Sequence, residues 1–312
     1  MPPPQSTFTI YDFAASWFFP WRFMIASTTF LPGTLASAVL AGDWRTLLSW
    51  NRLQSAWFGR FWGWAGPLVR TSAEENVVPL LEGRVTGGRI VERSAAHARG
   101  VGGTVLEIGP GSGNWVSIFS DRYLSSTGSS TSTSGSLSNP NPDAAAAPGS
   151  RGKVTRVFGV EPNAGVHAEL RAKIVAAGLE DVYEIVPVGI QDLAPSGRVL
   201  LESADCIVTV MCLCSIPDPQ LNIKELYGYL KPGGRWFVYE HVKCSHSQSW
   251  VVGAYQGFMN LIWPPFIGGC ELRRDTGKWI KEAGPWSDVD LTAPHGQPWF
   301  HVLPHVIGIL TK

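Results

Sequence analysis

The stretch from Val105 to Trp115, which reads VLEIGPGSGNW, constrains this chain more than any other segment. It contains an apolar strand run, an acidic residue, and then glycine at every second position. Because glycine has no Cβ, the backbone can turn sharply there and approach a ligand closely. We expect a helix to follow, and the amides at a helix N-terminus favour an electron-rich ligand group. The segment therefore predicts a ligand-binding turn after a strand.

The spacing of these glycines separates two kinds of cofactor. A dinucleotide-binding turn has the pattern G-x-G-x-x-G after a strand. Gly109 and Gly111 fit that pattern, but Asn114 stands where the third glycine is required. The pattern that is present, E-x-G-x-G-x-G from Glu107 to Gly113, resembles the first motif of class I S-adenosylmethionine-dependent methyltransferases. A dinucleotide site and a structural glycine loop remain the alternatives.

A second predicted strand that ends in an acidic residue follows, in the order that this resemblance implies. The segment TRVFGVEPN at 155–163 is an apolar strand that ends at Glu161, followed by Pro162 and Asn163. A carboxylate at the end of the second strand can accept hydrogen bonds from both ribose hydroxyls of a bound nucleoside. The alternative is an acid that merely ends a strand.

The segment VPVGIQDL at 186–193 looks like the loop in which the superfamily holds adenine. By that resemblance Asp192 accepts from the exocyclic amine and Ile190 covers a ring face. Gln191 departs from the pattern, because relatives often carry an acid there. A buried strand that ends at Met211 and the segment LKPGG at 230–234 complete the series of motifs.

The predicted ligand is thus S-adenosylmethionine, with S-adenosylhomocysteine as the product. The residues expected to bind it are Glu107, Gly109, Gly111, Gly113, Asn114, Glu161, Pro162, Asn163, Ile190, Gln191, Asp192 and Met211.

The rest of the chain alternates between strands and helices, as in a doubly wound sheet. Further strands are expected near 183–186, 205–211 and 235–240, and further helices near 163–177, 219–230 and 247–262. Segments 286–291 and 306–310 are expected to pair as an antiparallel hairpin. The predicted fold class is α/β, a Rossmann-like class I methyltransferase sheet that is mostly parallel and doubly wound, with an antiparallel final hairpin and an apolar aromatic N-terminal extension.

That extension differs in kind from the rest of the chain. Residues 8–64 are rich in Trp and Phe and poor in charge, and Pro20, Arg22 and Pro32 interrupt the apolar runs. None of the uninterrupted apolar runs in this region reaches the roughly 18 residues that a membrane-spanning helix needs. Aromatic residues mixed with arginines suit a membrane interface. We expect residues 1–71 to be a membrane-associating or lid region, with a wall of the substrate pocket as the alternative.

The remaining part, residues 72–312, is expected to form the methyltransferase domain, entered by a helix from Ser72 that Pro79 and the Gly87-Gly88 pair loosen. Residues 125–150 are nearly all Ser, Thr, Gly, Asn, Pro and Ala. Such a segment buries too little apolar surface to offset its ordering entropy. It is predicted to be a disordered surface insertion.

Charge and cysteine usage exclude several functions. Lys and Arg number 25, and Asp and Glu also number 25, so the formal net charge is zero, and no basic run is present. Nothing therefore indicates a nucleic-acid partner. The five cysteines form no C-x-x-C pair, and the histidines of the C-terminal part have no ligand spacing, so no metal is expected. Reduced thiols in a cytosol-facing compartment fit this pattern.

Short segments of the C-terminal half sharpen the resemblance. They are CLCSI at 212–216, LKPGG at 230–234, EHV at 240–242, IGGC at 267–270 and PHVIG at 304–308. They look like the membrane-anchored methyltransferase-like family, whose animal members methylate alkyl thiols on endoplasmic reticulum and lipid droplets. The resemblance covers about Gly102 to Lys312 without the insertion. It implies a small hydrophobic substrate, a membrane surface as partner, and the cytosolic face of the endoplasmic reticulum or a lipid droplet as location, with the cytoplasm as the alternative.

The chemistry depends on the acceptor atom. A thiol with a pKa near 8.5 offers a few per cent thiolate at neutral pH, whereas a phenol or alcohol needs a base. His241, at the predicted carboxyl end of the fifth strand, is the candidate base, with a structural histidine as the alternative. Thiol S-methylation leads. An O- or C-methyltransferase of a lipid, quinone or secondary metabolite, and a non-catalytic membrane or lipid-droplet module on the same fold, are the alternatives.

Overall fold

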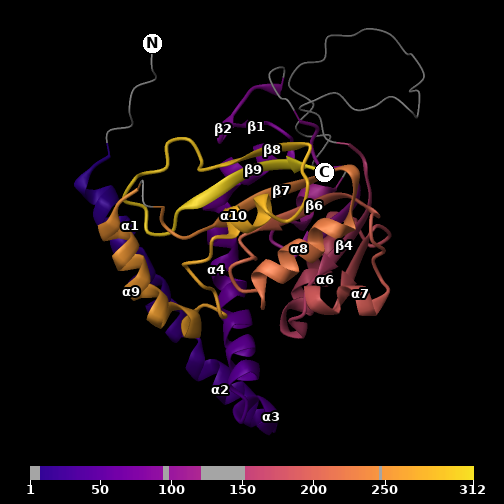
Figure 1. The fold of residues 1–312 in the computed structure, drawn as a ribbon. Helices are drawn as coiled ribbons and strands as arrows, with labels where there is room; N and C mark the ends of the chain where they lie inside the picture. The colour runs from indigo at the N-terminus through magenta and orange to yellow at the C-terminus, as the bar shows by residue number, and fades with distance from the viewer. Residues whose placement is uncertain (1–7, 94–97, 121–151, 246–247) are drawn as a thin grey trace, which may run out of the picture.

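The structure, a computed structural model, describes residues 8–93, 98–120, 152–245 and 248–312 (Figure 1). The predicted insertion at 125–150 lies outside these ranges. A seven-stranded sheet occupies the centre, in the order β5-β4-β3-β6-β7-β9-β8. Its strands are β3 (Gly103–Ile108), β4 (Val154–Val160), β5 (Tyr183–Val186), β6 (Ala204–Val210), β7 (Leu230–His241), β8 (Asp288–Thr292) and β9 (His305–Thr311).

The pairing confirms the predicted fold class. Strands β3 to β7 pair in parallel, while β9 pairs antiparallel with both β7 and β8. The order reverses at β3, which lies between β4 and β6, so the carboxyl ends of β3, β4 and β6 meet at one crevice.

Alternate residues of the strands supply the cores on the two faces of the sheet. Val105 lies in one core, against α4 (Trp50–Leu81), η2 (Val116–Phe119) and α6 (His167–Ala177). Leu106 lies in the other, against α7 (Leu193–Ser196), α8 (Pro219–Tyr229) and α10 (Thr276–Lys281). Side chains of successive strand residues point to opposite faces, so strands buried on both faces read as nearly continuous apolar runs.

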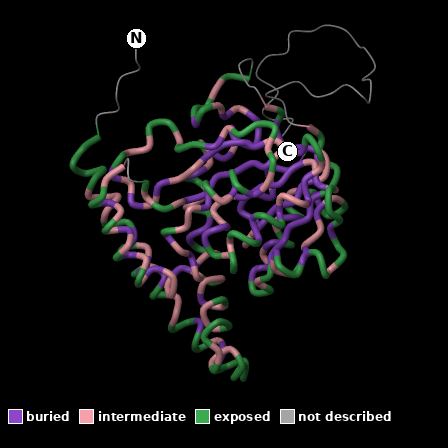
Figure 2. Tube along the Cα trace, viewed as in Figure 1, coloured by how far each residue is buried: buried purple, intermediate pink, exposed green. Residues whose placement is uncertain are grey.

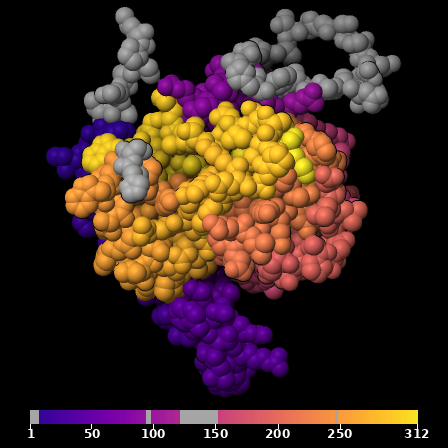
Figure 3. Space-filling view, viewed as in Figure 1, coloured from indigo at the N-terminus to yellow at the C-terminus, as the bar shows by residue number. Residues whose placement is uncertain are grey.

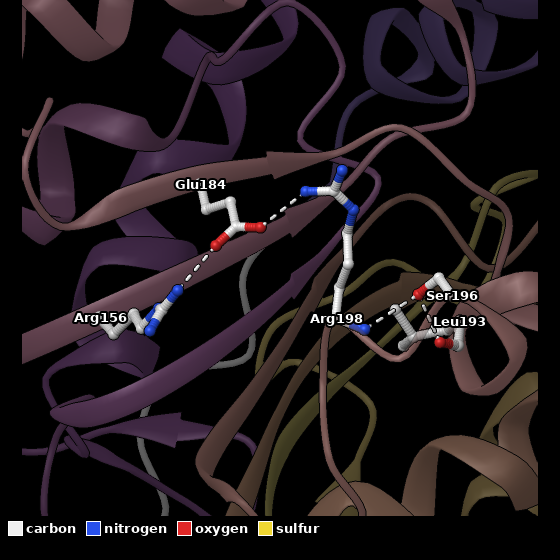
Figure 4. Close-up of polar contacts among 5 residues, drawn as sticks. All are labelled: Arg156, Glu184, Leu193, Ser196 and Arg198. Carbon is white, nitrogen blue, oxygen red and sulfur yellow. Dashed lines mark hydrogen bonds and ion pairs between the residues drawn. The ribbon is translucent and has the colours of Figure 1, made fainter.

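The same alternation is visible at the edge strand β5. Tyr183 is buried, whereas the next residue, Glu184, turns outward and binds two arginines (Figure 4). Its carboxylate oxygens lie 2.8 Å from Arg156 and 3.0 Å from Arg198. Both pairs are largely solvent-exposed, and such pairs contribute little to stability.

The expectations for individual helices need three corrections. The glycine turn is followed by the short 3-10 helix η2 within the described residues, not by an α-helix. The helix expected from Ser72 is the end of α4, which begins at Trp50 and runs straight through Pro79. The Gly87-Gly88 pair forms the turn between β1 (Val85–Thr86) and β2 (Arg89–Ile90), because both glycines adopt positive φ angles. The predicted boundary between residues 71 and 72 lies inside α4.

The N-terminal region is helical. It contains α1 (Ile10–Thr28), α2 (Leu31–Leu40), α3 (Trp44–Leu47) and the start of α4. In Figure 1, α1 lies beside α9 (Trp250–Phe266), and the ring centroids of Trp17 and Tyr255 are 4.4 Å apart. Helices α2 and α3 with the first turns of α4 project from the body in Figure 3, and Figure 2 shows that much of this extension is exposed.

The expected interruption of the apolar run at Pro20 does not occur, because α1 continues through that residue. Among the described residues, Ile10–Leu40 is the one helical stretch that is long and apolar enough to cross a membrane. Only 22% of its most apolar window is buried in the protein, unlike a core helix.

Candidate functional site

One large cavity, of about 1130 Å³, opens at the carboxyl ends of the parallel strands. Its walls come from the loops after β3, β4, β5 and β6, from the end of β7 and from α1, α4 and α9. The turn after α9 and the segment between β8 and β9 complete them. Predicted site residues in these walls are Gly109, Gly111, Asn114, Glu161, Pro162, Asn163, Ile190, Gln191, Met211 and His241. Glu107, Gly113 and Asp192 do not line it. A smaller cavity of about 380 Å³ at the other end of the strands contains no predicted site residue.

The glycine turn has a conformation that requires glycine. Gly109, Gly111 and Gly113 have φ angles of +63°, +57° and +81°. A Cβ on Gly109 would lie 2.7 Å from Cβ of Cys212, and one on Gly113 would lie 2.9 Å from Leu170. A side chain at either position would therefore clash with the residues packed against the turn.

Glu161 joins the turn to the second strand. Its carboxylate accepts hydrogen bonds from the Gly111 amide at 2.9 Å and the Asn163 amide at 2.8 Å. Burial raises the pKa of Glu161, and these two amides partly counter the rise. A carboxylate has about four acceptor positions, so roughly two remain for groups in the cavity.

Glu107 lies behind this turn and is completely enclosed. Its carboxylate accepts a hydrogen bond of 2.5 Å from the Tyr183 hydroxyl, across the intervening strand β4. The crossing is possible because Gly159 stands between them, where any Cβ would overlap the Tyr183 ring. Burial raises the pKa of Glu107 to about 7, and the nearby Glu161 adds to the rise. Glu107 thus ties β3 to β5 across β4, and sequence reasoning did not find its partner.

The loop assigned to adenine lies at the cavity edge. Ile190 is buried in the wall, and Gln191 also faces the cavity. The Asp192 carboxylate instead accepts a hydrogen bond of 3.1 Å from the Gln191 side chain, outside the wall. The predicted contact of Asp192 with an exocyclic amine therefore stays a prediction.

Helix α4 contributes to the site in a way that the sequence motifs did not indicate. Arg70 donates to the main-chain oxygen of Asn114 at 2.6 Å, and Lys173 of α6 donates to the Asn114 side chain at 3.0 Å. Gly66 of α4 has no room for a side chain, because a Cβ there would overlap the Asn114 amide. The N-terminal region is thus a structural part of the cavity wall beside the glycine turn.

The opposite wall begins at the end of β6. Met211 has a φ angle of +52°, unusual for a residue with a side chain, and its amide bonds the Tyr239 carbonyl at 2.8 Å. The buried Glu240 carboxylate then accepts from the amides of Cys212 and Leu213 at 3.1 and 3.2 Å. Burial raises the pKa of Glu240 to about 8. Glu240 therefore fixes the loop after β6, and His241 points beyond it into the cavity.

Three buried groups gather where this wall meets the turn after α9. The ligand atoms of Cys214, His241 and Cys270 all lie within 4.8 Å of one another. The His241 Nε2 atom is 3.1 Å from Cys270 Sγ. The Cys270 thiol, with the imidazole close by, holds the pKa of the Cys214 thiol well below its usual value, whereas burial raises that of Cys270. Sequence reasoning proposed His241 as a base but did not bring the three residues together, because the two cysteines belong to segments distant along the chain.

The remaining walls are largely apolar. Phe19, Phe23, Phe58, Trp62 and Trp263 line the cavity. They come from α1, α4 and α9, so the aromatic N-terminal region does form part of the pocket. This arrangement suits a hydrophobic molecule with a small polar head.

The residues at the turn fit S-adenosylmethionine. The backbone is open at Gly111, where a Cβ would approach only Trp62, at 3.5 Å. The Glu161 carboxylate keeps acceptor capacity for two vicinal ribose hydroxyls after binding two amides. Gly109, Gly111, Asn114 and Glu161 would hold the amino-acid and ribose parts, and Ile190 would cover adenine.

Comparison with known proteins agrees with this reading of the geometry. Residues 86–279 match a family model described as "Methyltransferase domain". This match covers more than half of the chain and includes the glycine turn, Glu161, Glu240 and Cys270.

Thiol S-methyltransferases are among the similar proteins. TMT1B of Rattus norvegicus is 35% identical over 111 residues, which are 35% of this chain and 44% of that protein. TMT1A of Homo sapiens is 30% identical over 149 residues, 47% of this chain and 53% of that protein. The chain thus spans about half the length of the curated relatives that it matches.

Solved structures share the general architecture at low identity. An O-methyltransferase family protein from Burkholderia thailandensis is 14% identical with a TM-score of 0.48, covering 98% of this chain and 74% of that one. The N-methyltransferase NodS from Bradyrhizobium japonicum, solved with S-adenosylhomocysteine, is 12% identical with a TM-score of 0.41, covering 68% and 79%.

Proposed function

This chain belongs to the methyltransferase domain family and carries an S-adenosylmethionine-dependent methyltransferase domain, and we propose that the whole protein methylates the sulfur of a small hydrophobic thiol. The observation that carries the proposal is the single cavity that joins the cofactor residues to an apolar chamber with Cys214, His241 and Cys270 in its wall. The similarity to proteins named thiol S-methyltransferases supports the choice of sulfur.

The chain's own residues have three tasks in this reaction. When bound, the cofactor supplies an activated methyl group, so the protein mainly has to align an acceptor atom with it. The glycine turn and Glu161 orient the cofactor, and the aromatic walls exclude water from the acceptor. We place the acceptor atom beside His241. This polar side chain lies in the wall of the chamber, and it is the residue predicted from sequence to act on the substrate.

The test uses matched thiol and phenol forms of one acceptor, 4-propylthiophenol and 4-propylphenol, with isotope-labelled S-adenosylmethionine in detergent. We expect labelled thioether from the thiol and no product from the phenol. Methylation of the phenol alone would overturn the choice of sulfur and favour the oxygen acceptor, with His241 as base. Binding of S-adenosylhomocysteine without turnover of either compound would favour a non-catalytic module.

We further propose that the protein associates with a membrane through the outer faces of α1, α2 and α9. Large apolar side chains are exposed there, among them Phe18, Ile25, Leu40, Trp250 and Leu261. Exposed Arg45 and Arg52 follow α2 in the chain and suit lipid headgroups. Since α1 also lines the cavity, a hydrophobic acceptor would enter from the lipid side. The resemblance to the membrane-anchored family supports the endoplasmic reticulum or a lipid droplet.

Flotation with phosphatidylcholine vesicles tests this second proposal. The double variant Phe18→Ser, Ile25→Ser should lose most of its vesicle binding, because both side chains are exposed on α1. The matched control is Val175→Ser, since Val175 is also an exposed apolar residue but lies on α6. Equal binding of both variants would contradict the assignment of this face.

A further inference from the structure

The cavity wall contains a set of groups that the general-base assignment of His241 does not explain. Cys214, His241 and Cys270 are all buried, and their ligand atoms lie within 4.8 Å of one another. A tetrahedral zinc ion, with Zn–S of about 2.3 Å and Zn–N of about 2.0 Å, separates its ligand atoms by roughly 3.5 to 3.8 Å. The observed spacing reaches this geometry by small side-chain rotations.

One nitrogen of the His241 imidazole contacts a thiol, and the other has no hydrogen-bond partner among the described residues. His241 Nδ1 is buried and has no hydrogen-bond partner among the described residues, while Nε2 faces the Cys270 sulfur. Two other histidines differ, since the buried His167 bonds the Glu161 carbonyl at 2.8 Å and the half-buried His301 bonds the Leu303 carbonyl at 2.8 Å. The His241 ring is thus positioned by sulfur and not by a backbone carbonyl, and Nε2 is the nitrogen that lies beside the thiols.

The three residues are held by a rigid backbone frame. Glu240 fixes the loop before Cys214 through two amides. The Glu271 amide donates to the Cys214 carbonyl at 3.0 Å, which ties the two cysteine loops directly together. Gly268 and Gly269 have φ angles of +56° and +78°, and this turn after α9 brings Cys270 to the site. Metal sites need ligands positioned in this way by surrounding hydrogen bonds.

The local charges suit a site with two thiolates. One guanidinium nitrogen of Arg274 donates to the carbonyls of Leu213 and Ile216 at 2.8 and 2.6 Å, so this cation lies beside the loop that carries Cys214. Zinc with two protein thiolates is neutral, and a third thiolate from the substrate would make it singly negative. The cation beside it would compensate that charge.

We propose that Cys214, His241 and Cys270 form a Zn²⁺ site whose fourth position faces the cavity and binds the acceptor thiol as a thiolate. This inference rests on the proposed function, which it deepens. Three protein ligands and one open position are the usual arrangement of a catalytic zinc, and Cys₂His is a known ligand set for it. All three residues line the cavity, so the open position is accessible to substrate.

The step balances without an oxidant. The acceptor thiol displaces water from zinc and loses its proton to solvent, because a coordinated thiol is deprotonated. The sulfur lone pair then forms the bond to the methyl carbon, and the broken carbon–sulfur bond leaves its electron pair on S-adenosylhomocysteine. The neutral thioether binds zinc weakly and leaves. His241 serves here as a ligand and not as the base.

The first experiment measures metal binding on the full chain without turnover. The protein is stripped with a chelator under reducing conditions and titrated with Co²⁺, which reports tetrahedral thiolate sites by its visible absorption. We expect one Co²⁺ per chain, with sulfur-to-cobalt charge transfer that Zn²⁺ abolishes. The Cys270→Ser and His241→Gln variants should lose this absorption, and the Cys244→Ser control should keep it, because Cys244 does not line the cavity. Binding of S-adenosylhomocysteine verifies that each variant is folded.

Adding the matched acceptors separates this inference from the proposed function. The thiol should shift the cobalt spectrum and the phenol should not. An alkyl thiol such as 3-phenylpropane-1-thiol has a pKa no lower than about 8.5, so zinc raises its thiolate fraction at pH 7 from a few per cent toward unity, and its kcat/KM should fall at least about 30-fold in the stripped protein. The aryl thiol, which is already largely ionised at this pH, should lose less. Absence of cobalt absorption, or full S-methylation by folded Cys270→Ser, would overturn the zinc site and leave the proposed function standing. A thiol that shifts the spectrum but is never methylated would overturn the function and leave the site.

Discussion

The two ends of the cavity are built in opposite ways. At the cofactor end, the turn after β3 places its ligand-facing groups within a few consecutive residues, and Glu161 follows at the end of the next strand in the sheet. At the acceptor end, the loop after β6, the last residue of β7 and the turn after α9 each supply one of Cys214, His241 and Cys270. A local motif is readable in the sequence, whereas a site assembled from distant loops emerges only when the chain is folded.

The largest effect is expected where the two ends touch, at Gly109. Its Cβ would meet the Cys212 side chain at 2.7 Å, and Cys212 begins the loop that Glu240 holds. Gly109→Ala should abolish detectable S-adenosylhomocysteine binding. It should also lower the free energy of unfolding by about 3 kcal/mol, of which the left-handed backbone accounts for about 1 to 2 kcal/mol. Urea denaturation and calorimetry measure the two effects.

The matched control is Gly197→Ala. Gly197 has the same φ angle of +63°, but no atom lies within 4 Å of its Cβ position. It should lose only the backbone part of the stability and bind S-adenosylhomocysteine normally. If both variants lose the same stability, the contact between the two ends is unimportant.

A smaller and purely local effect is expected at Glu161. Removal of its carboxylate takes away the predicted ribose contacts and two bonds within the turn. Hydrogen bonds to charged groups contribute about 1.5 to 3 kcal/mol each, so Glu161→Ala should weaken S-adenosylhomocysteine binding about 100-fold. Isothermal titration calorimetry measures this, with Glu184→Ala as the control, because Glu184 binds only surface arginines (Figure 4). Unchanged affinity in Glu161→Ala would exclude the ribose assignment.

These contrasts explain how much the sequence could predict. The strands of the sheet could be predicted from apolar runs and turn residues, because strands buried on both faces are nearly continuous runs of apolar residues. The partner of Glu107 could not be predicted, since it depends on Tyr183 lying across Gly159 in the strand between them. The continuous helix through Pro79 was missed because tertiary packing outweighs the helix-breaking tendency of proline at that position.

The buried pair of Glu107 and Tyr183 also predicts how the free energy of unfolding depends on pH. Burial raises the pKa of Glu107 in the folded chain to about 7, above its ordinary value of 4.5. The folded state therefore prefers the protonated carboxyl. Its stabilising contribution is complete below pH 4.5 and is lost as the pH rises through about 7. Between pH 5 and 7.5 this group should lower the free energy of unfolding by about 2 kcal/mol.

Denaturation of the parent chain and of Glu107→Gln across this pH range isolates the contribution. The variant should lack that part of the slope, because glutamine does not titrate. Tyr183→Phe should keep a slope displaced to higher pH, since the Tyr183 hydrogen bond lowers the pKa of Glu107. Parallel curves for the parent and Glu107→Gln would show that Glu107 is ionised in both states.

The smallest expected effect tests whether the N-terminal region truly belongs to the cofactor end. Arg70 of α4 donates to the Asn114 main-chain oxygen at 2.6 Å and so steadies the turn from outside the family motifs. A hydrogen bond from a charged group contributes about 1.5 to 3 kcal/mol. This bond acts on the turn and not on the ligand, so we expect about 1 kcal/mol of it to appear in binding, and Arg70→Ala should weaken S-adenosylhomocysteine binding about fivefold. Arg89→Ala, an exposed arginine on β2, should leave the affinity unchanged. If Arg70→Ala binds as tightly as the parent chain, α4 is only a cover over a site that forms without it. A fivefold loss would make α4 part of the proposed cofactor site, so that the N-terminal region contributes to cofactor affinity as well as to the apolar walls of the cavity.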